Sequence, residues 1–82
     1  MVKVQLVYTT TCQYCPSAKK LFKDLQKQYK FEYEEIDAIS PKGQELVGRF
    51  SIMAVPTIIV DDKVAFVGVP ARDKAEAAVK GG

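Results

Sequence analysis

The sequence Cys12-Gln13-Tyr14-Cys15-Pro16 holds both cysteines of this 82-residue chain, with two residues between them. The alternating apolar run Val2–Tyr8 comes before the pair and has the pattern of a buried strand. The amphipathic run Ala18–Tyr29 comes after it, and Pro16 is a residue that the first turn of a helix accommodates well. The sequence therefore places two thiols at a junction between a strand and a helix.

Composition limits the class of protein. We expect residues 1–82 to form a single domain, because a chain of this length has little room for a second core. The net charge of +2 is too small to indicate a nucleic-acid partner. There is no apolar run of about 18 residues and no signal-peptide core, so neither a membrane span nor export is expected. We predict a monomer in a reducing cytoplasm, where cysteine pairs are usually catalytic or metal-binding.

The rest of the chain predicts five further elements. Phe31–Ile36 has the pattern of a charged strand, which suits the edge of a sheet. A second helix is expected to begin with Ser40 as N-cap and Pro41 in first position. Val55–Val60 and Val64–Val67 flank a turn at residues 61–63 and predict a β-hairpin.

A weaker stripe of small residues predicts a last helix from Ala71 to an end at Gly81-Gly82. The polar loop Thr9-Thr10-Thr11 offers N-cap residues for the first helix. The resulting order is β-α-β-α-β-β-α. It predicts an α/β fold with a four-stranded mixed sheet, helices on both faces, and a parallel first β-α-β unit.

The two cysteines differ in their predicted accessibility. At about 100° per residue, Cys15 lies roughly 60° from the centre of the first helix's apolar stripe, and Cys12 lies roughly 120° from it. Cys12 also precedes the helix, where unpaired N–H groups and the positive end of the helix dipole favour an anion. Because a thiolate is the nucleophile in disulfide exchange, we predict that Cys12 attacks and that Cys15 resolves.

A metal site is the main alternative use of the pair. Zinc usually takes four cysteine or histidine ligands, and this chain has two cysteines and no histidine. We therefore expect no metal and no cofactor in a single chain. An iron–sulfur cluster or zinc ion bridging two copies stays open. A purely structural disulfide is disfavoured, because so short a loop removes little entropy from the unfolded chain.

Lysines fill the other side of the first helix: Lys19, Lys20, Lys23 and Lys27. A solvated face is the simplest interpretation of such a stripe. Attraction of an acidic reductase is the alternative.

A Cys-x-x-Cys pair at a helix start, followed by Val55-Pro56-Thr57 at a later strand start, resembles the thioredoxin-fold superfamily. The resemblance covers nearly the whole chain. It implies that Pro56 is cis and faces the disulfide, and that the backbone of Val55 pairs with a substrate peptide. Val55, Pro56 and Thr57 are thus the expected substrate-binding residues, together with Tyr14. For Tyr14, an exposed aromatic in a turn is the plainer interpretation.

Within that superfamily the motifs point two ways. The chain's length and Tyr14 are similar to glutaredoxins. Yet Thr9-Thr10-Thr11 stands where glutaredoxins carry a lysine, and Gly68-Val69-Pro70-Ala71 replaces their paired glycines and acidic residue. Leu6 stands where thioredoxins carry a buried acid. The chain is most similar to short thioredoxin/glutaredoxin-like proteins of archaea and bacteria.

This resemblance implies a thiol–disulfide oxidoreductase that reduces disulfide-containing proteins. Its electron donor would be a thioredoxin-type reductase, or glutathione. A glutathione-dependent glutaredoxin is the alternative within the class. A dimer-bridging iron–sulfur or zinc carrier is the alternative outside it.

Overall fold

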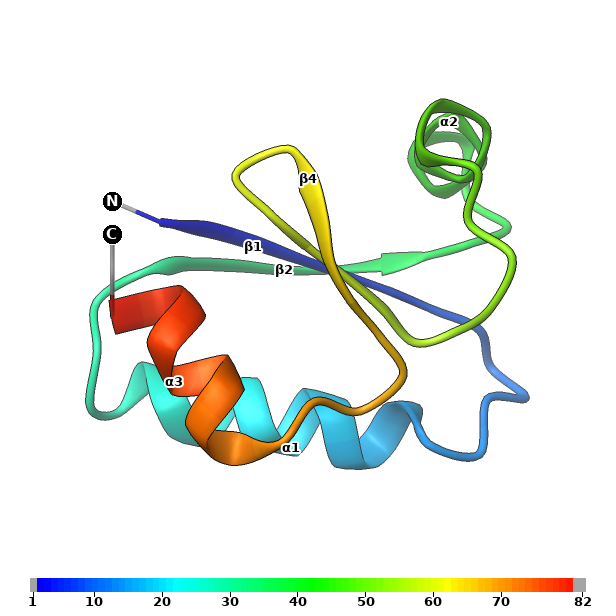
Figure 1. Ribbon diagram of the computed structural model, residues 1–82. Coiled ribbons are helices and arrows are strands. Elements are labelled where there is room, and N and C mark those ends of the chain that lie inside the picture. Colours follow the sequence, from blue (N-terminus) through cyan, green and yellow to red (C-terminus); the bar gives the residue numbers. More distant parts are fainter. Residues whose placement is uncertain (1, 81–82) are drawn as a thin grey trace.

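A four-stranded sheet lies at the centre of the computed structural model, which describes residues 2–80 (Figure 1). Its strands are β1 (Lys3–Tyr8), β2 (Glu32–Asp37), β3 (Thr57–Val60) and β4 (Lys63–Val67), in the order β2-β1-β3-β4. β1 pairs parallel with β2 and antiparallel with β3, and β3 pairs antiparallel with β4. The glutamate-rich β2 lies at an edge, as predicted, and the apolar β1 is central.

Three helices cover the sheet from both sides: α1 (Cys15–Gln26), α2 (Pro41–Phe50) and α3 (Arg72–Lys80). α1 and α3 lie together on one face, and α2 lies on the other (Figure 1). The predicted α/β fold and its element order are confirmed. None of the helices within residues 2–80 is long and apolar enough to cross a membrane.

The core has two parts because successive strand residues point to opposite faces. Leu6 of β1 packs with Phe22 and Ile58 on the side of α1 and α3. Its neighbour Val7 packs with Leu46 on the side of α2. These side chains are almost fully buried, and each contributes about 1.5–3 kcal/mol by leaving water.

The ends of α1 differ from the prediction. Its N-cap is Tyr14, whose side chain makes no capping hydrogen bond within the described chain, so the expectation that Thr9-Thr10-Thr11 would supply a cap is wrong. The reason is that Thr9 begins a turn of its own, in which its carbonyl accepts from the Cys12 N–H at 3.2 Å. α1 then ends at Gln26 instead of Tyr29, and the Tyr29 ring packs against the core from a turn.

The C-terminal elements also shift by a residue. Asp61 and Asp62 take the left-handed backbone, with φ of 50° and 63°, and so complete the hairpin turn by themselves. Lys63 pairs with Val60 and belongs to β4, although the sequence placed it in the turn. The last helix begins at Arg72, one residue after the predicted Ala71. Its predicted end at Gly81-Gly82 lies outside the described residues.

The start of α2 follows the prediction closely. The Ser40 hydroxyl accepts from the Gly43 N–H at 3.0 Å and donates to the Asp37 carbonyl at 2.6 Å, so it joins the helix to the end of β2. Pro41 opens the helix. α2 ends where Ser51 takes the left-handed backbone at φ 53°, and the chain then turns back toward β3.

Candidate active site

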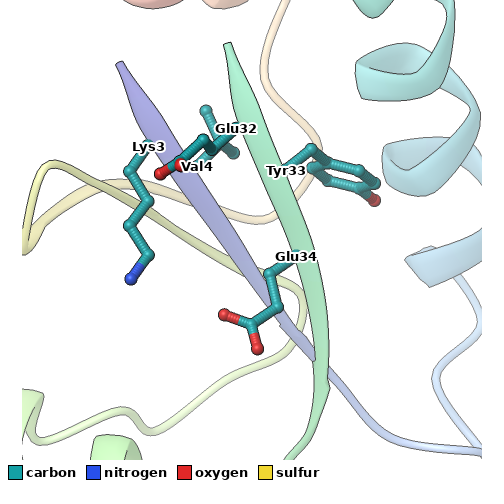
Figure 2. A pocket seen from close by; sticks show the side chains of 5 residues that line it. All are labelled: Lys3, Val4, Glu32, Tyr33 and Glu34. Carbon is teal, nitrogen blue, oxygen red and sulfur yellow. The ribbon is translucent and has the colours of Figure 1, made fainter. Parts of the chain in front are cut away.

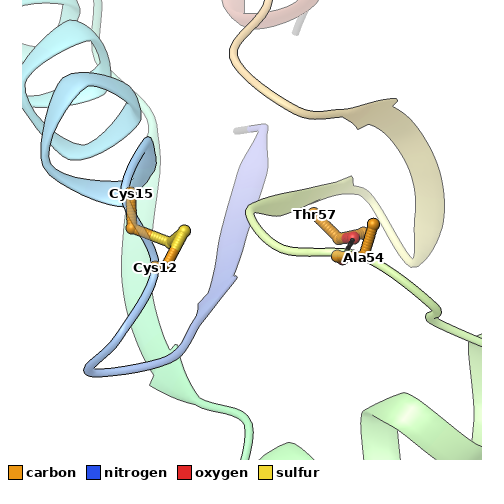
Figure 3. The surroundings of a disulfide bond; sticks show 4 residues. All are labelled: Cys12, Cys15, Ala54 and Thr57. Atoms are coloured by element: carbon orange, nitrogen blue, oxygen red, sulfur yellow. Dashed lines mark hydrogen bonds between the residues drawn. A yellow bond between two sulfur atoms is a disulfide. The ribbon is translucent and has the colours of Figure 1, made fainter.

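Cys12 and Cys15 form a disulfide where the loop after β1 meets α1 (Figure 3). Their Cα atoms are 5.4 Å apart, within the ordinary range for a disulfide. Cys12 lies in the loop, and Cys15 is the first residue of α1. The strand-to-helix junction therefore brings the two sulfur atoms together in a closed, oxidised pair.

The two sulfur-bearing side chains differ in burial. Cys15 is 2% exposed and packs at the start of the α1 core face. Cys12 is partly exposed. An incoming thiol or disulfide thus reaches Cys12 more easily than Cys15, which is the order of accessibility that the helical periodicity indicated.

The electrostatic setting of Cys12 comes from α1. No acidic residue lies in the first turn of this helix, so its positive dipole end is not neutralised there. The partial charge of that end favours a thiolate once the disulfide is reduced. One turn further along, the Lys19 ammonium lies 3.5 Å from the centroid of the Tyr8 ring, at the end of β1. Lys19 is therefore held against the strand that leads to Cys12.

The Val55-Pro56-Thr57 segment lies at the same end of the sheet. Thr57 pairs with Val7 of β1, which puts the residues before it opposite the loop that carries Cys12. The Val55–Pro56 peptide bond is cis. Figure 3 shows Ala54 and Thr57 on the segment across from the disulfide. Residues about forty positions apart in the sequence thus lie at the same end of the sheet.

Hydrogen bonds hold this segment in place. The Thr57 hydroxyl donates to the Ala54 carbonyl at 2.6 Å, and the Gly68 N–H donates to the Pro56 carbonyl at 2.7 Å. Pro56 and Thr57 are both buried. The backbone N–H and C=O of Val55, by contrast, form no hydrogen bond within residues 2–80. The Val55 N–H and C=O are therefore available to pair with another chain, at the end of the sheet that carries the disulfide.

A family model described as "Thioredoxin domain" matches residues 2–80. The chain belongs to the thioredoxin family. The "Probable Thioredoxin" of Methanothermobacter marburgensis is 32% identical over 76 residues, covering 90% of this chain and 87% of that protein. The "Thioredoxin" of Methanocaldococcus jannaschii is 30% identical over 83 residues, covering 96% and 93%.

Solved structures agree with that assignment. The reduced thioredoxin pre-protein of Schistosoma mansoni superposes with a TM-score of 0.78 at 26% identity, covering 98% of this chain and 77% of that one. A mutant thioredoxin from Halobacterium salinarum superposes with a TM-score of 0.79 at 20% identity and shows the same fold, covering 98% and 73%. With its Cys-x-x-Cys pair at disulfide distance, this thioredoxin-family protein is a thiol–disulfide oxidoreductase.

Leu6 of β1, at the position where the resemblance to thioredoxins implies a buried acid, is fully buried in this thioredoxin-family protein. The carboxylate beside it comes from the neighbouring strand, where Glu35 is in register with Leu6. Glu35 accepts from the Tyr33 hydroxyl at 2.9 Å and lies 3.7 Å from Lys23 Nζ. Burial and the hydrogen bond to Glu35 raise the pKa of Tyr33 above its usual range. Sequence reasoning missed this neighbour, because strand register is not visible in a local pattern.

Three loops that build the site of this thioredoxin-family protein also expose apolar side chains. Tyr14 between the cysteines is 63% exposed, and Met53 before the cis peptide bond is 97% exposed. Val69 is exposed just after Gly68, which bonds to Pro56. Of these three residues, only Tyr14 was predicted from the sequence to contact a substrate. Met53 and Val69 could have been found as apolar residues in predicted loops.

Two other features of the described chain bear on alternative sites. Among residues 2–80, no group of three or more histidine, cysteine, aspartate or glutamate side chains could hold a metal ion. A shallow pocket lies over the β1–β2 edge and is lined by Lys3, Val4, Glu32, Tyr33 and Glu34 (Figure 2). It begins at the start of β1, the end of that strand farther from the cysteines, so it is separate from the disulfide.

Proposed function

We propose that this protein is a protein disulfide reductase in which Cys12 is the nucleophile and Cys15 resolves the intermediate. The observation that carries the proposal is the unequal burial of the two cysteines, at the same end of the sheet as the Val55 peptide groups that form no hydrogen bond within residues 2–80. A substrate disulfide can approach Cys12 from solvent. It cannot reach Cys15 without displacing the packing at the start of α1.

The reaction takes place in two exchanges. In the reduced protein, the Cys12 thiolate attacks one sulfur of the substrate disulfide, forms a mixed disulfide and releases the first substrate thiolate. The Cys15 thiolate then attacks the Cys12 sulfur. This step forms the Cys12–Cys15 disulfide and releases the second substrate thiolate, so two electrons have passed to the substrate. Because Leu6 supplies no carboxylate, water accepts the proton of the Cys15 thiol before this attack, and solvent protonates the released substrate thiolates.

The substrate is held by backbone pairing at Val55. Its N–H and C=O form no hydrogen bond within residues 2–80, so they can pair with an extended substrate segment as with a neighbouring strand. Pro56 and Thr57 are buried, so they support the substrate-binding segment from inside the protein. Their hydrogen bonds fix the course of residues 54–57. Exposed Tyr14 contacts the substrate beside Cys12. The same contacts suit any disulfide-containing protein with an accessible extended segment.

A thioredoxin-type reductase is the proposed electron donor, and a reducing cytoplasm is the compartment that would keep the dithiol form. The support is that the archaeal relatives carry the name thioredoxin. In addition, Thr9-Thr10-Thr11 and Gly68-Val69-Pro70-Ala71 depart from the glutaredoxin pattern. One chain contains both thiols that the reaction needs, so exchange requires no second copy and no metal.

Trapping variants test the roles of the two cysteines. Cys15→Ser should accumulate a covalent mixed disulfide with insulin or with a peptide disulfide, because no second thiol in the protein resolves it. Cys12→Ser should form none and should lose exchange. Both variants lack the disulfide, so each is the matched control for the other's stability. Equal trapping, or equal residual exchange, would contradict the assignment.

The donor is tested by two assays of the wild-type protein. Insulin reduction is followed with thioredoxin reductase and NADPH, and reduction of a glutathione mixed disulfide is followed with glutathione and glutathione reductase. Faster turnover with the reductase supports the proposed donor. Faster turnover with glutathione would identify a glutaredoxin, and a brown, iron-containing dimer after anaerobic purification would identify a cluster carrier.

A further inference from the structure

Positive charge is concentrated in one element of this protein. Residues 16–30, which comprise α1 after Cys15 and the turn that follows, contain five lysines and one aspartate. That segment therefore carries a net charge of +4, although the whole chain carries +2. The remainder of the sequence is net acidic. The excess of positive charge is thus a property of α1 together with the turn that follows it, and not of the surface in general.

Most of these lysines line one strip of the α1 surface, which starts next to the disulfide at Pro16. A shallow groove along α1 is lined by Pro16, Lys19, Lys20, Lys23, Asp24 and Lys27, and we call this surface the lysine groove. Pro16 follows Cys15 directly in the first turn, so one end of the groove adjoins the active site. At 1.5 Å per residue, the groove extends about 17 Å from Pro16 to Lys27.

The charges of the lysine groove are only weakly neutralised. Lys23 Nζ lies 3.7 Å from Glu35 and Lys27 Nζ lies 3.8 Å from Asp24, and these two lysine side chains are 63% and 80% exposed. Exposed pairs at such distances contribute about 0–1 kcal/mol and separate easily. Lys20 makes no ion pair within residues 2–80. A partner with opposite charge can therefore bind these ammonium groups at little cost.

We infer that the lysine groove docks an acidic surface of the protein whose disulfide or dithiol is being exchanged. This inference rests on the proposed thiol–disulfide exchange and names its partner class, a protein with aspartate or glutamate flanking the reacting sulfurs. Opposite charge speeds diffusional encounter and repels basic competitors. The lysine groove adjoins the disulfide, so a protein bound along α1 can bring its own sulfur to Cys12. This position favours a protein partner over a nucleic acid.

Three synthetic disulfide peptides of equal length provide the test, with the cystine flanked by glutamates, by serines or by lysines. The rate of thiol loss from the reduced protein is divided by the rate with dithiothreitol, which removes the effect of flanking charge on the peptide's own reactivity. We expect the acidic peptide to react about tenfold faster than the basic one in 10 mM salt. The ratio should approach one in 1 M salt, where the screening length falls from about 30 Å to about 3 Å.

Two triple variants locate the effect. Lys20→Gln with Lys23→Gln and Lys27→Gln should bring the ratio close to one in low salt. Lys63→Gln with Lys74→Gln and Lys80→Gln removes the same charge from exposed lysines outside the groove and should keep the tenfold ratio. An unchanged ratio in the groove variant, or an equal fall in both variants, would overturn the inference.

The outcomes also separate this inference from the proposed function. If the reduced protein reacts with none of the three peptides, the proposed exchange fails. If it reacts with the serine peptide but shows no preference for the acidic one, the docking inference alone fails. Groove-dependent binding of a 20-base-pair DNA duplex without any peptide preference would assign the groove to nucleic acid and overturn the inference.

Discussion

Replacing Gly43 with alanine should destabilise this protein, and the same change at Gly48 in the same helix should stabilise it. Gly43 is buried in the first turn of α2, against the end of β2. A Cβ there would overlap the Asp37 carbonyl oxygen and lie 2.7 Å from the Asp37 carbonyl carbon and 2.8 Å from Ala38 Cα. These are backbone atoms, which cannot rotate away as a side chain can.

The magnitude follows from three contributions. Alanine favours a helix over glycine by about 1 kcal/mol. At Gly43 this gain is opposed by an overpacking cost of about 1–3 kcal/mol. Moving Gly43 also lengthens its 3.0 Å hydrogen bond to the Ser40 hydroxyl, a cap worth about 1 kcal/mol. The expected net change in the free energy of unfolding is a loss of about 1–3 kcal/mol.

Gly48 isolates the helix-propensity contribution. It is exposed, and apart from its own helix nothing in residues 2–80 lies within 4 Å of an added Cβ. Gly48→Ala should therefore gain about 0.5–1 kcal/mol. Urea unfolding of the oxidised protein, followed by circular dichroism at 222 nm, measures both variants against the wild type. Gly43→Ala that is as stable as the wild type would refute the steric argument, because it would mean that α2 moves away from β2 without cost.

Two further predictions concern pH. The Lys42 ammonium donates to both Glu34 carboxylate oxygens, at 2.9 and 2.8 Å, and holds the pKa of Glu34 below its usual range. A carboxyl group whose pKa is lowered by folding stabilises the native state at pH values above its unfolded-state pKa of about 4.3. This stabilisation is lost as the pH falls through the lower native-state pKa. Lys42→Met should thus lose about 0.2–1 kcal/mol at pH 7 and almost nothing at pH 2, and an equal loss at both pH values in urea unfolding would contradict it. Tyr33 has a raised pKa, so above about pH 10 the unfolded chain ionises there before the native chain does, and stability falls as the pH rises. Tyr33→Phe should remove this part of the alkaline loss between pH 9 and 11, and unfolding curves with identical pH slopes in variant and wild type would count against it.

Elements with a strong local pattern were predictable from the sequence. The alternation of Val2–Tyr8 indicated β1, and the Ser40-Pro41 pair indicated the start of α2. Both signals depend on residues a few positions apart, where backbone geometry sets the contacts. The boundaries of α1 and β4 were predicted wrongly because small differences in local hydrogen bonding decide them. The Thr9 carbonyl bonds within its own turn, so no threonine caps α1, and Lys63 joins β4 because two aspartates suffice for the hairpin turn.

The active site was also predictable only in part from the sequence. Periodicity indicated that Cys15 is the more buried of the two cysteines, and the structure agrees, although Cys12 lies in the loop before α1 and not on the helix itself. The resemblance to thioredoxins supplied the meeting of Val55-Pro56-Thr57 with the disulfide.

Other features required the tertiary structure. Glu35 lies beside Leu6, the Thr57 hydroxyl donates to the Ala54 carbonyl, and Gly43 touches the end of β2. The Val55 backbone has no hydrogen-bond partner among residues 2–80. Each depends on the register of strands and on the hydrogen bonds left over after distant segments pair. A local pattern of residue types specifies which face of an element is apolar. It does not specify which backbone groups of another segment will lie against that face.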